Sequence, residues 1–201
     1  LLLGTSSLWR EIERRYTHSI LTLPMSRGQC WLGKFAGLAL FLSVCTLILT
    51  MVAAGLVAVA AATFPSETPI AWGVFFLAAA CDGLKAILVA ALAMFFSAVA
   101  TSFYLPFFVT LALYFAGSAI QEVYEYLQSQ YGEQVAPAVL WAAKSLYYVL
   151  PNFSVFNYKV QAIYALPVTG GEIALTLAYF ILYSGLTLGL ALFIFGRRQF
   201  S

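Results

Sequence analysis

The stretch "WLGKFAGLALFLSVCTLILTMVAAGLVAVAAATF", residues 31–64, decides the fold. Lys34 is its only charged residue, and it closes at the polar, Pro-flanked turn "FPSETP". A helix rises about 1.5 Å per residue and a bilayer core is about 30 Å thick, so this run is longer than a crossing requires. It therefore predicts a membrane-spanning helix that tilts or projects from the lipid at its beginning.

The composition of the whole chain agrees with a membrane location. Hydrophobic residues make up 63% of the 201 residues and charged residues only 9%, and the mean hydropathy is +0.91. A soluble domain has roughly 45–50% apolar and about 25% charged residues. We therefore predict an integral membrane protein, and the formal net charge of only +2 gives no support to a nucleic-acid partner.

Three further apolar runs follow, at residues 70–100, 103–120 and 173–196. Between the last two runs, residues 121–171 combine a Tyr-rich acidic segment, a short apolar piece that cannot cross a bilayer, and irregular connections. We expect an all-α membrane protein with one transmembrane domain over residues 1–201. It would be a helical bundle with four spans and with interfacial or re-entrant helices before the last span.

The basic residues orient these spans. The segments before the first span and after the last hold seven of them, Arg10, Arg14, Arg15, Arg27, Lys34, Arg197 and Arg198. The opposite side holds only Lys144 and Lys159. Because cytoplasmic segments are rich in Lys and Arg, both ends of the chain are expected in the cytoplasm and residues 121–171 outside.

Residues 8–27 have a different character. Apolar side chains recur at helical spacing there, namely Leu8, Ile12, Tyr16, Ile20 and Leu23. This pattern predicts an amphipathic helix that Pro24 ends. Its polar face mixes acidic and basic residues, which suits a protein partner better than an anionic lipid surface, although a helix lying on lipid headgroups is the alternative.

Gly28, Gly33 and Lys34 have the spacing of a phosphate-binding loop. Such a loop needs small residues between its glycines and a Ser or Thr after the lysine to hold Mg²⁺. Here Trp31 lies inside the segment and Phe35 follows the lysine. The residues therefore indicate no nucleotide site on this chain.

The segment "EIERRYTHSILTLPMSRGQCWLGKF", residues 11–35, resembles the cytoplasmic coupling segment of permease subunits in the type-two ABC exporter family. That pattern is an acidic residue, a short helix, a Leu-x-x-Pro-x-Ser-Arg stop, and a Gly-Lys pair that enters the next span. It is matched here by Glu11 or Glu13, Leu21, Pro24, Ser26, Arg27, Gly33 and Lys34.

The resemblance implies a transport subunit, not an enzyme, to which a separate cytoplasmic ABC ATPase binds. ATP and Mg²⁺ would be held by that partner, and this chain would carry no cofactor. The residues to which the resemblance gives the coupling role are Glu11, Glu13, Arg14, Arg15, Thr17, Pro24 and Arg27. It also implies a second permease copy in a homodimer or heterodimer, surrounding lipid, and the cytoplasmic membrane of a bacterium or archaeon. Because these permeases usually have six spans, two further spans are expected before the four in this sequence.

Asp82 and Lys85 interrupt the second apolar run near the expected bilayer centre. They are three residues apart and so share a helix face. Ionisable side chains at that depth are costly unless they are paired and face the bundle. The pair is either a structural ion pair that fixes helix packing or part of a transport path.

Two further sets of residues are expected to have structural roles, one in helix packing and one in anchoring the external connection. Gly33 with Gly37, and Gly185 with Gly189, have the four-residue spacing that lets helices approach closely, in the bundle or at a dimer interface. Six aromatic residues of the external connection are expected to anchor it at the membrane–water boundary, the alternative being that they guide an amphipathic substrate on the external side. They are Trp141, Tyr147, Tyr148, Phe153, Phe156 and Tyr158.

No pattern for catalysis or metal binding is present in the sequence. His18 is the single histidine, and the three cysteines have no metal-ligand spacing. We therefore predict no catalytic residue and no metal site. Two alternatives to a permease stay open, namely a membrane anchor or assembly subunit of a complex, and a secondary transporter that uses Asp82 and Lys85.

Overall fold

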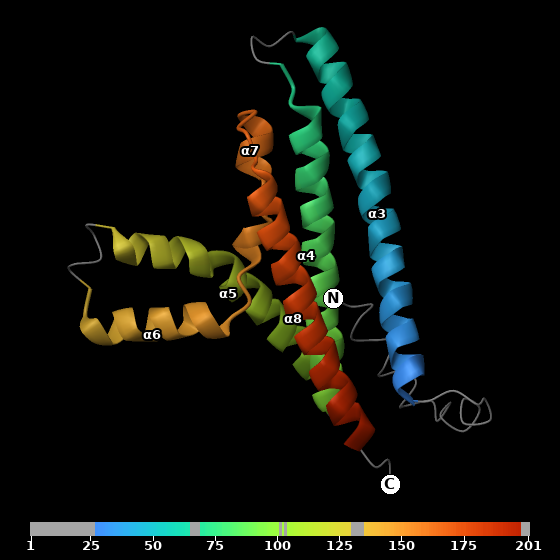
Figure 1. Ribbon diagram of the computed structural model, residues 1–201, viewed down its shortest axis with the longest axis vertical. Helices are drawn as coiled ribbons and strands as arrows, with labels where there is room; N and C mark the ends of the chain where they lie inside the picture. Colours follow the sequence, from blue (N-terminus) through green and yellow to red (C-terminus); the bar gives the residue numbers. More distant parts are fainter. Residues whose placement is uncertain (1–26, 65–68, 101, 103, 130–134, 198–201) are drawn as a thin grey trace.

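The computed structural model describes residues 27–64, 69–100, 102, 104–129 and 135–197. The elements, labelled as in Figure 1, are α3 (Arg27–Thr63), α4 (Trp72–Val99), α5 (Tyr104–Gln128), α6 (Pro137–Val149), the 3₁₀ helix η2 (Phe153–Phe156), α7 (Lys159–Ile163) and α8 (Gly170–Arg197). These described ranges contain no strand. Four helices, α3, α4, α5 and α8, are long and apolar enough to cross a membrane. The expected all-helical membrane fold with four candidate spans is therefore confirmed.

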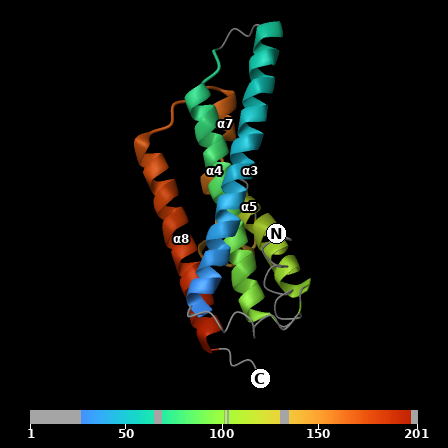
Figure 2. The same ribbon diagram turned by 90° about the vertical axis from the view of Figure 1, so that its right-hand side faces the viewer.

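Helix α4 is the centre of the bundle and packs against α3, α5 and α8. Small residues allow this close approach, because Ala90, Ala91 and Ala93 are buried on α4. The beginning of α3 and the end of α8 lie at the same end of the bundle (Figures 1 and 2). This is expected when an even number of membrane-spanning helices separates the beginning of α3 from the end of α8.

Helix α3 lies at the side of the bundle with its apolar side chains largely uncovered. Its most hydrophobic window contains no buried residue. Near its beginning, Trp31 is only 1% exposed and packs with Met94 of α4 and Ala191 of α8. The helix is thus fixed to its neighbours at that end, and its remaining apolar surface suits lipid or another membrane helix.

Helix α5 bends away from the bundle. Its first half runs beside α4, and its second half turns outward and lies next to α6 (Figure 1). The rings of Tyr124 and Tyr147 stack across this α5–α6 arm with centroids 4.2 Å apart. The sequence predicted a span ending at residue 120 and a separate interfacial helix, whereas one helix continues to Gln128. The polarity changes at Gln121, but no residue that breaks a helix occurs there.

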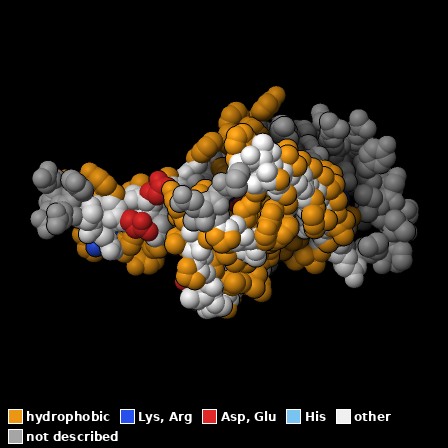
Figure 3. Space-filling model, turned by 90° about the horizontal axis from the view of Figure 1, so that it is seen from above, with side chains coloured by type: hydrophobic (Ala, Val, Ile, Leu, Met, Phe, Trp, Pro, Cys, Tyr) orange, Lys and Arg blue, Asp and Glu red, His pale blue; other side chains and the backbone are white. Residues whose placement is uncertain are grey.

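Charged side chains gather on this arm (Figure 3). Glu122, Glu125 and Lys144 are all exposed on it. The bundle, in contrast, presents mostly hydrophobic side chains. This separation of polar arm and apolar bundle agrees with an arm at a membrane surface and a bundle in lipid.

The connection from α6 to α8 returns into the bundle. Phe153 and Phe156 are 1% and 0% exposed, and Tyr158 is 6% exposed. All three belong to one core cluster with Leu88 and Leu92 of α4. The prediction that they anchor the chain at the membrane–water boundary was therefore wrong for these three rings. Burial of these large aromatic rings stabilises the connection. The backbone polar groups of the connection form hydrogen bonds within the bundle.

Gly117 of α5 makes room for this connection. A Cβ atom at this position would overlap the carbonyl oxygen of Pro151 and lie 2.8 Å from Cδ2 of Phe153. The neighbouring atom is backbone and cannot rotate away. No other residue type fits here without moving η2.

We expect Gly117→Ala to lower the melting temperature of the protein in lipid nanodiscs by about 5 °C or more, because overpacking a core costs roughly 1–3 kcal/mol. Gly55→Ala on α3 is the matched control, since no atom lies within 4 Å of a Cβ there. Equal melting temperatures for the two variants would contradict the close approach at Gly117.

Candidate functional site

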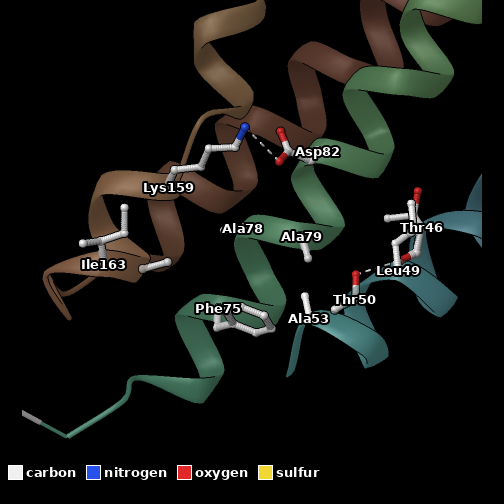
Figure 4. Close-up of a pocket in the computed structure, with 11 residues that line it drawn as sticks. Thr46, Leu49, Thr50, Ala53, Phe75, Ala78, Ala79, Asp82, Lys159 and Ile163 are labelled. Atoms are coloured by element: carbon white, nitrogen blue, oxygen red, sulfur yellow. Dashed lines mark hydrogen bonds and ion pairs between the residues drawn. The ribbon is translucent and has the colours of Figure 1, made fainter. Parts of the chain in front are cut away.

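Three charged side chains meet on one side of α4 and form what we call the charge cluster. Lys85 Nζ lies 3.0 Å from Asp82 Oδ1. Lys159 Nζ lies 3.4 Å from Asp82 Oδ2 (Figure 4). Asp82 and Lys85 are one turn apart on α4, whereas Lys159 is the first residue of α7. The first contact is an ion pair by distance, although its angle does not meet the geometry of a hydrogen bond. One carboxylate thus faces two ammonium groups.

The position of Lys159 depends on the residue before it. The buried Tyr158 hydroxyl lies 2.8 Å from Thr176 Oγ1 of α8. Thr176 Oγ1 also lies 3.3 Å from the carbonyl oxygen of Val155, to which it donates. Since a threonine hydroxyl has one hydrogen, Tyr158 is then the donor to Thr176. These bonds hold the beginning of α7 against the bundle and bring Lys159 to Asp82.

Burial differs among the three charges. The side chain of Lys85 is 16% exposed, that of Asp82 35%, and that of Lys159 59%. The predicted Asp82–Lys85 pair is therefore formed, and it is partly buried. Lys159 was not predicted to join it, because the sequence places this residue in an external connection. The aromatic residues just before it, in "NFSVFNY", favour burial of this segment, but they do not indicate Asp82 as the partner of Lys159.

Two hollows border the charge cluster. The first, the α7 hollow, has a volume of about 480 Å³ and lies between α3, α4 and α7 (Figure 4). The second, the α5 hollow, has about 490 Å³ and lies between α3, α4 and α5. Asp82 and Lys159 line both, and Lys85 also lines the second. The walls are otherwise almost entirely apolar, with Leu49, Phe75 and Ile163 in the first hollow and Leu42, Leu111 and Phe115 in the second.

Most of the predicted coupling residues lie outside the described residues. These are Glu11, Glu13, Arg14, Arg15, Thr17 and Pro24. Arg27 is the first residue of α3. The coupling role of this segment stays a prediction.

The predicted glycine contacts are not found among the described residues. A Cβ atom at Gly33, Gly37, Gly185 or Gly189 would meet no atom within 4 Å. A packing role for them would need a helix other than those that the structure describes, and it stays a prediction. Gly83, in contrast, lies close to Thr46 of α3, with Cγ2 3.1 Å from the Cβ position.

The described residues contain no group of three His, Cys, Asp or Glu side chains that could hold a metal ion. What the site offers is an ionic centre between two apolar surfaces. Such an arrangement can bind or orient a ligand.

The family model of the ABC-2 family transporter proteins matches residues 1–200. The chain belongs to this family. It is the family that the segment of residues 11–35 resembles, and the match extends over the four candidate spans. The protein is therefore an integral membrane protein and the permease component of an ABC transporter. No curated protein and no solved structure matches the chain.

We expect Asp82→Asn to destabilise this permease by roughly 2–3 kcal/mol, because it leaves two ammonium groups without a counter-charge. The value lies below the roughly 3–5 kcal/mol of a fully buried pair, since Asp82 is one-third exposed. Adding Lys85→Gln to that variant should restore much of the loss. Thermal unfolding in nanodiscs measures both effects.

Glu172→Gln is the control for loss of a carboxylate, because Glu172 is exposed at the beginning of α8. If Asp82→Asn and Glu172→Gln have the same melting temperature, the charge cluster does not stabilise the bundle.

Proposed function

We propose that this permease moves its substrate by coupling to ATP hydrolysis on a separate cytoplasmic ABC ATPase subunit. The observation that carries the proposal is the family match over residues 1–200, which includes the segment at residues 8–27. Permeases of this family work with an ABC ATPase in general. The mixed acidic and basic face of residues 8–27 suits a protein surface.

The conformation of residues 28–34 also supports ATP binding on a separate subunit. Gly28, Gly33 and Lys34 all lie within α3. Gly33 and Lys34 lie beyond the first turn of this helix, where the backbone N–H groups are bonded to carbonyls one turn earlier, so they cannot close around a phosphate. ATP and Mg²⁺ therefore belong to the partner in this proposal, and this chain holds no cofactor.

In the proposed complex, Glu11, Glu13, Arg14, Arg15 and Thr17 contact the ATPase. Pro24 and Arg27 set the angle between the coupling helix and α3. Closure of the ATPase on ATP then tilts the spans between two states. The beginning of α3 and the end of α8 lie at one end of the bundle. In the proposed complex this end faces the cytoplasm of a bacterium or archaeon.

The proposal includes a second permease copy, identical or related. The uncovered apolar surface of α3 and the open positions beside Gly33 and Gly37 suit another membrane helix. Gly185 and Gly189 give α8 a similar surface. Lipid covers the rest of the bundle.

We expect Glu13→Lys to weaken co-purification of the ATPase by about tenfold. The substitution replaces a negative charge at the proposed contact with a positive one, which no longer complements the surface of the ATPase. The measurement is quantitative mass spectrometry of the complex isolated in mild detergent, together with ATP-driven transport in proteoliposomes. ATP hydrolysis and transport should lose their coupling.

Glu122→Lys is the matched control, since it makes the same change on the exposed arm. Unchanged coupling in Glu13→Lys would refute the assignment of residues 8–27. Transport that needs no ATPase and follows an ion gradient would instead favour a secondary transporter built on Asp82 and Lys85.

A further inference from the structure

The charge cluster has a surplus of positive charge. Among the described residues, Asp82 is the only carboxylate within ion-pair distance of Lys85 or Lys159. The other described acids, Glu122, Glu125 and Glu172, make no ion pair with either lysine. One carboxylate neutralises one ammonium group, so a formal charge of +1 is left over. In a membrane bundle such a charge needs a counter-ion.

The surplus belongs mainly to Lys159. Asp82 and Lys85 form the shorter contact, 3.0 Å, within a single helix. Lys159 lies further from the carboxylate, at 3.4 Å, and 59% of its side chain is exposed. It also lines both hollows. Lys85 lines only the α5 hollow and its side chain is 16% exposed, so the ammonium group of Lys159 is the more available of the two to an incoming anion.

The walls around this ammonium group do not suit a small hydrated anion. In the α7 hollow the hydroxyls of Thr46 and Thr50 donate to carbonyls of their own helix, at 2.9 Å and 2.7 Å. They offer no hydrogen to a ligand. In this hollow an inorganic anion would lose its water and gain only Lys159, whereas a hydrocarbon chain matches the remaining surface.

We propose that the charge cluster and the two hollows bind an amphiphile with an anionic headgroup, and that this amphiphile is the substrate of the permease. Lys159 pairs with the headgroup, and the apolar walls of the hollows take the hydrocarbon. Each hollow, at about 480–490 Å³, has the size of a small-molecule site. The substrate assignment rests on the proposed function, while the binding site does not.

The test uses the full complex in nanodiscs of zwitterionic lipid and three probes with the same sixteen-carbon chain and terminal pyrene. One carries a sulfonate, one a hydroxyl and one a trimethylammonium group. Energy transfer from tryptophan to pyrene reports binding. We expect the sulfonate to bind at least about tenfold more tightly than the alcohol, and the cation to bind most weakly.

Lys159→Gln should reduce the advantage of the sulfonate over the alcohol to about twofold or less, without changing the affinity for the alcohol. This variant keeps the Asp82–Lys85 pair and so leaves no charge unpaired. Lys144→Gln, on the exposed face of α6, is the matched control and should keep full selectivity. Lys159→Arg should also keep it.

Equal affinities for the three probes, or unchanged selectivity in Lys159→Gln, would overturn the binding site. ATP-driven movement of the sulfonate between leaflets of proteoliposomes then tests the substrate assignment. Selective binding without such movement, by a complex that hydrolyses ATP, would overturn the assignment and identify a resident anionic lipid. If no ABC ATPase co-purifies with the permease, the proposed function is contradicted. The binding measurement is made without ATP, so it tests the binding site separately.

Discussion

The structure depends on how the backbone of residues 151–158 enters an apolar bundle without a long helix of its own. In lipid or in a protein core, each unpaired N–H or C=O is costly, so such a segment needs side chains as partners. The hydroxyl of Tyr179 accepts from the N–H of Asn152 at 2.7 Å. The Asn152 side chain accepts from Ser154 N at 3.0 Å and donates to Gln121 at 2.8 Å. Ser154 Oγ donates to the carbonyl of Ser118 at 3.0 Å.

These bonds join three parts of the molecule at one point. Gln121 and Ser118 belong to α5, at the place where it leaves the bundle, and Tyr179 belongs to α8. Gly117 lies in the same turn of α5 and admits the Pro151 carbonyl. The outward arm and the buried η2 helix are therefore fixed by the same contacts. Lys159 follows five residues after Ser154, so its place in the charge cluster depends on them too.

The sequence was sufficient for features that depend on local composition. The first span was expected at residues 31–64 and is found as α3, at Arg27–Thr63. It was predictable because an apolar run of this length with so little charge is typical of a membrane-spanning helix. The contact of Asp82 with Lys85 was predictable because it joins two positions three residues apart on one helix.

Features that depend on distant contacts were not predictable in this way. Nothing near Lys159 in the sequence indicates that Asp82 lies beside it. The spacing of Gly33 and Gly37 describes a helix face but does not say what meets that face. Gly117 has no partner at that spacing, yet it makes the closest approach among the described glycines. A single glycine can matter only through the segment that packs against it, which in this case is Pro151.

Helix α3 links the two ends of the proposed mechanism. It begins directly after the segment proposed to bind the ATPase, and Leu38, Leu42 and Leu49 of α3 line the two hollows. Its 37 residues form one helix of about 55 Å. It is buried at Trp31 and largely uncovered beyond that point. A rigid rod held near one end tilts as a whole when that end is turned. In the proposed mechanism a rotation of the coupling segment therefore changes the distance of α3 from α4, and with it the width of the hollows that α3 lines.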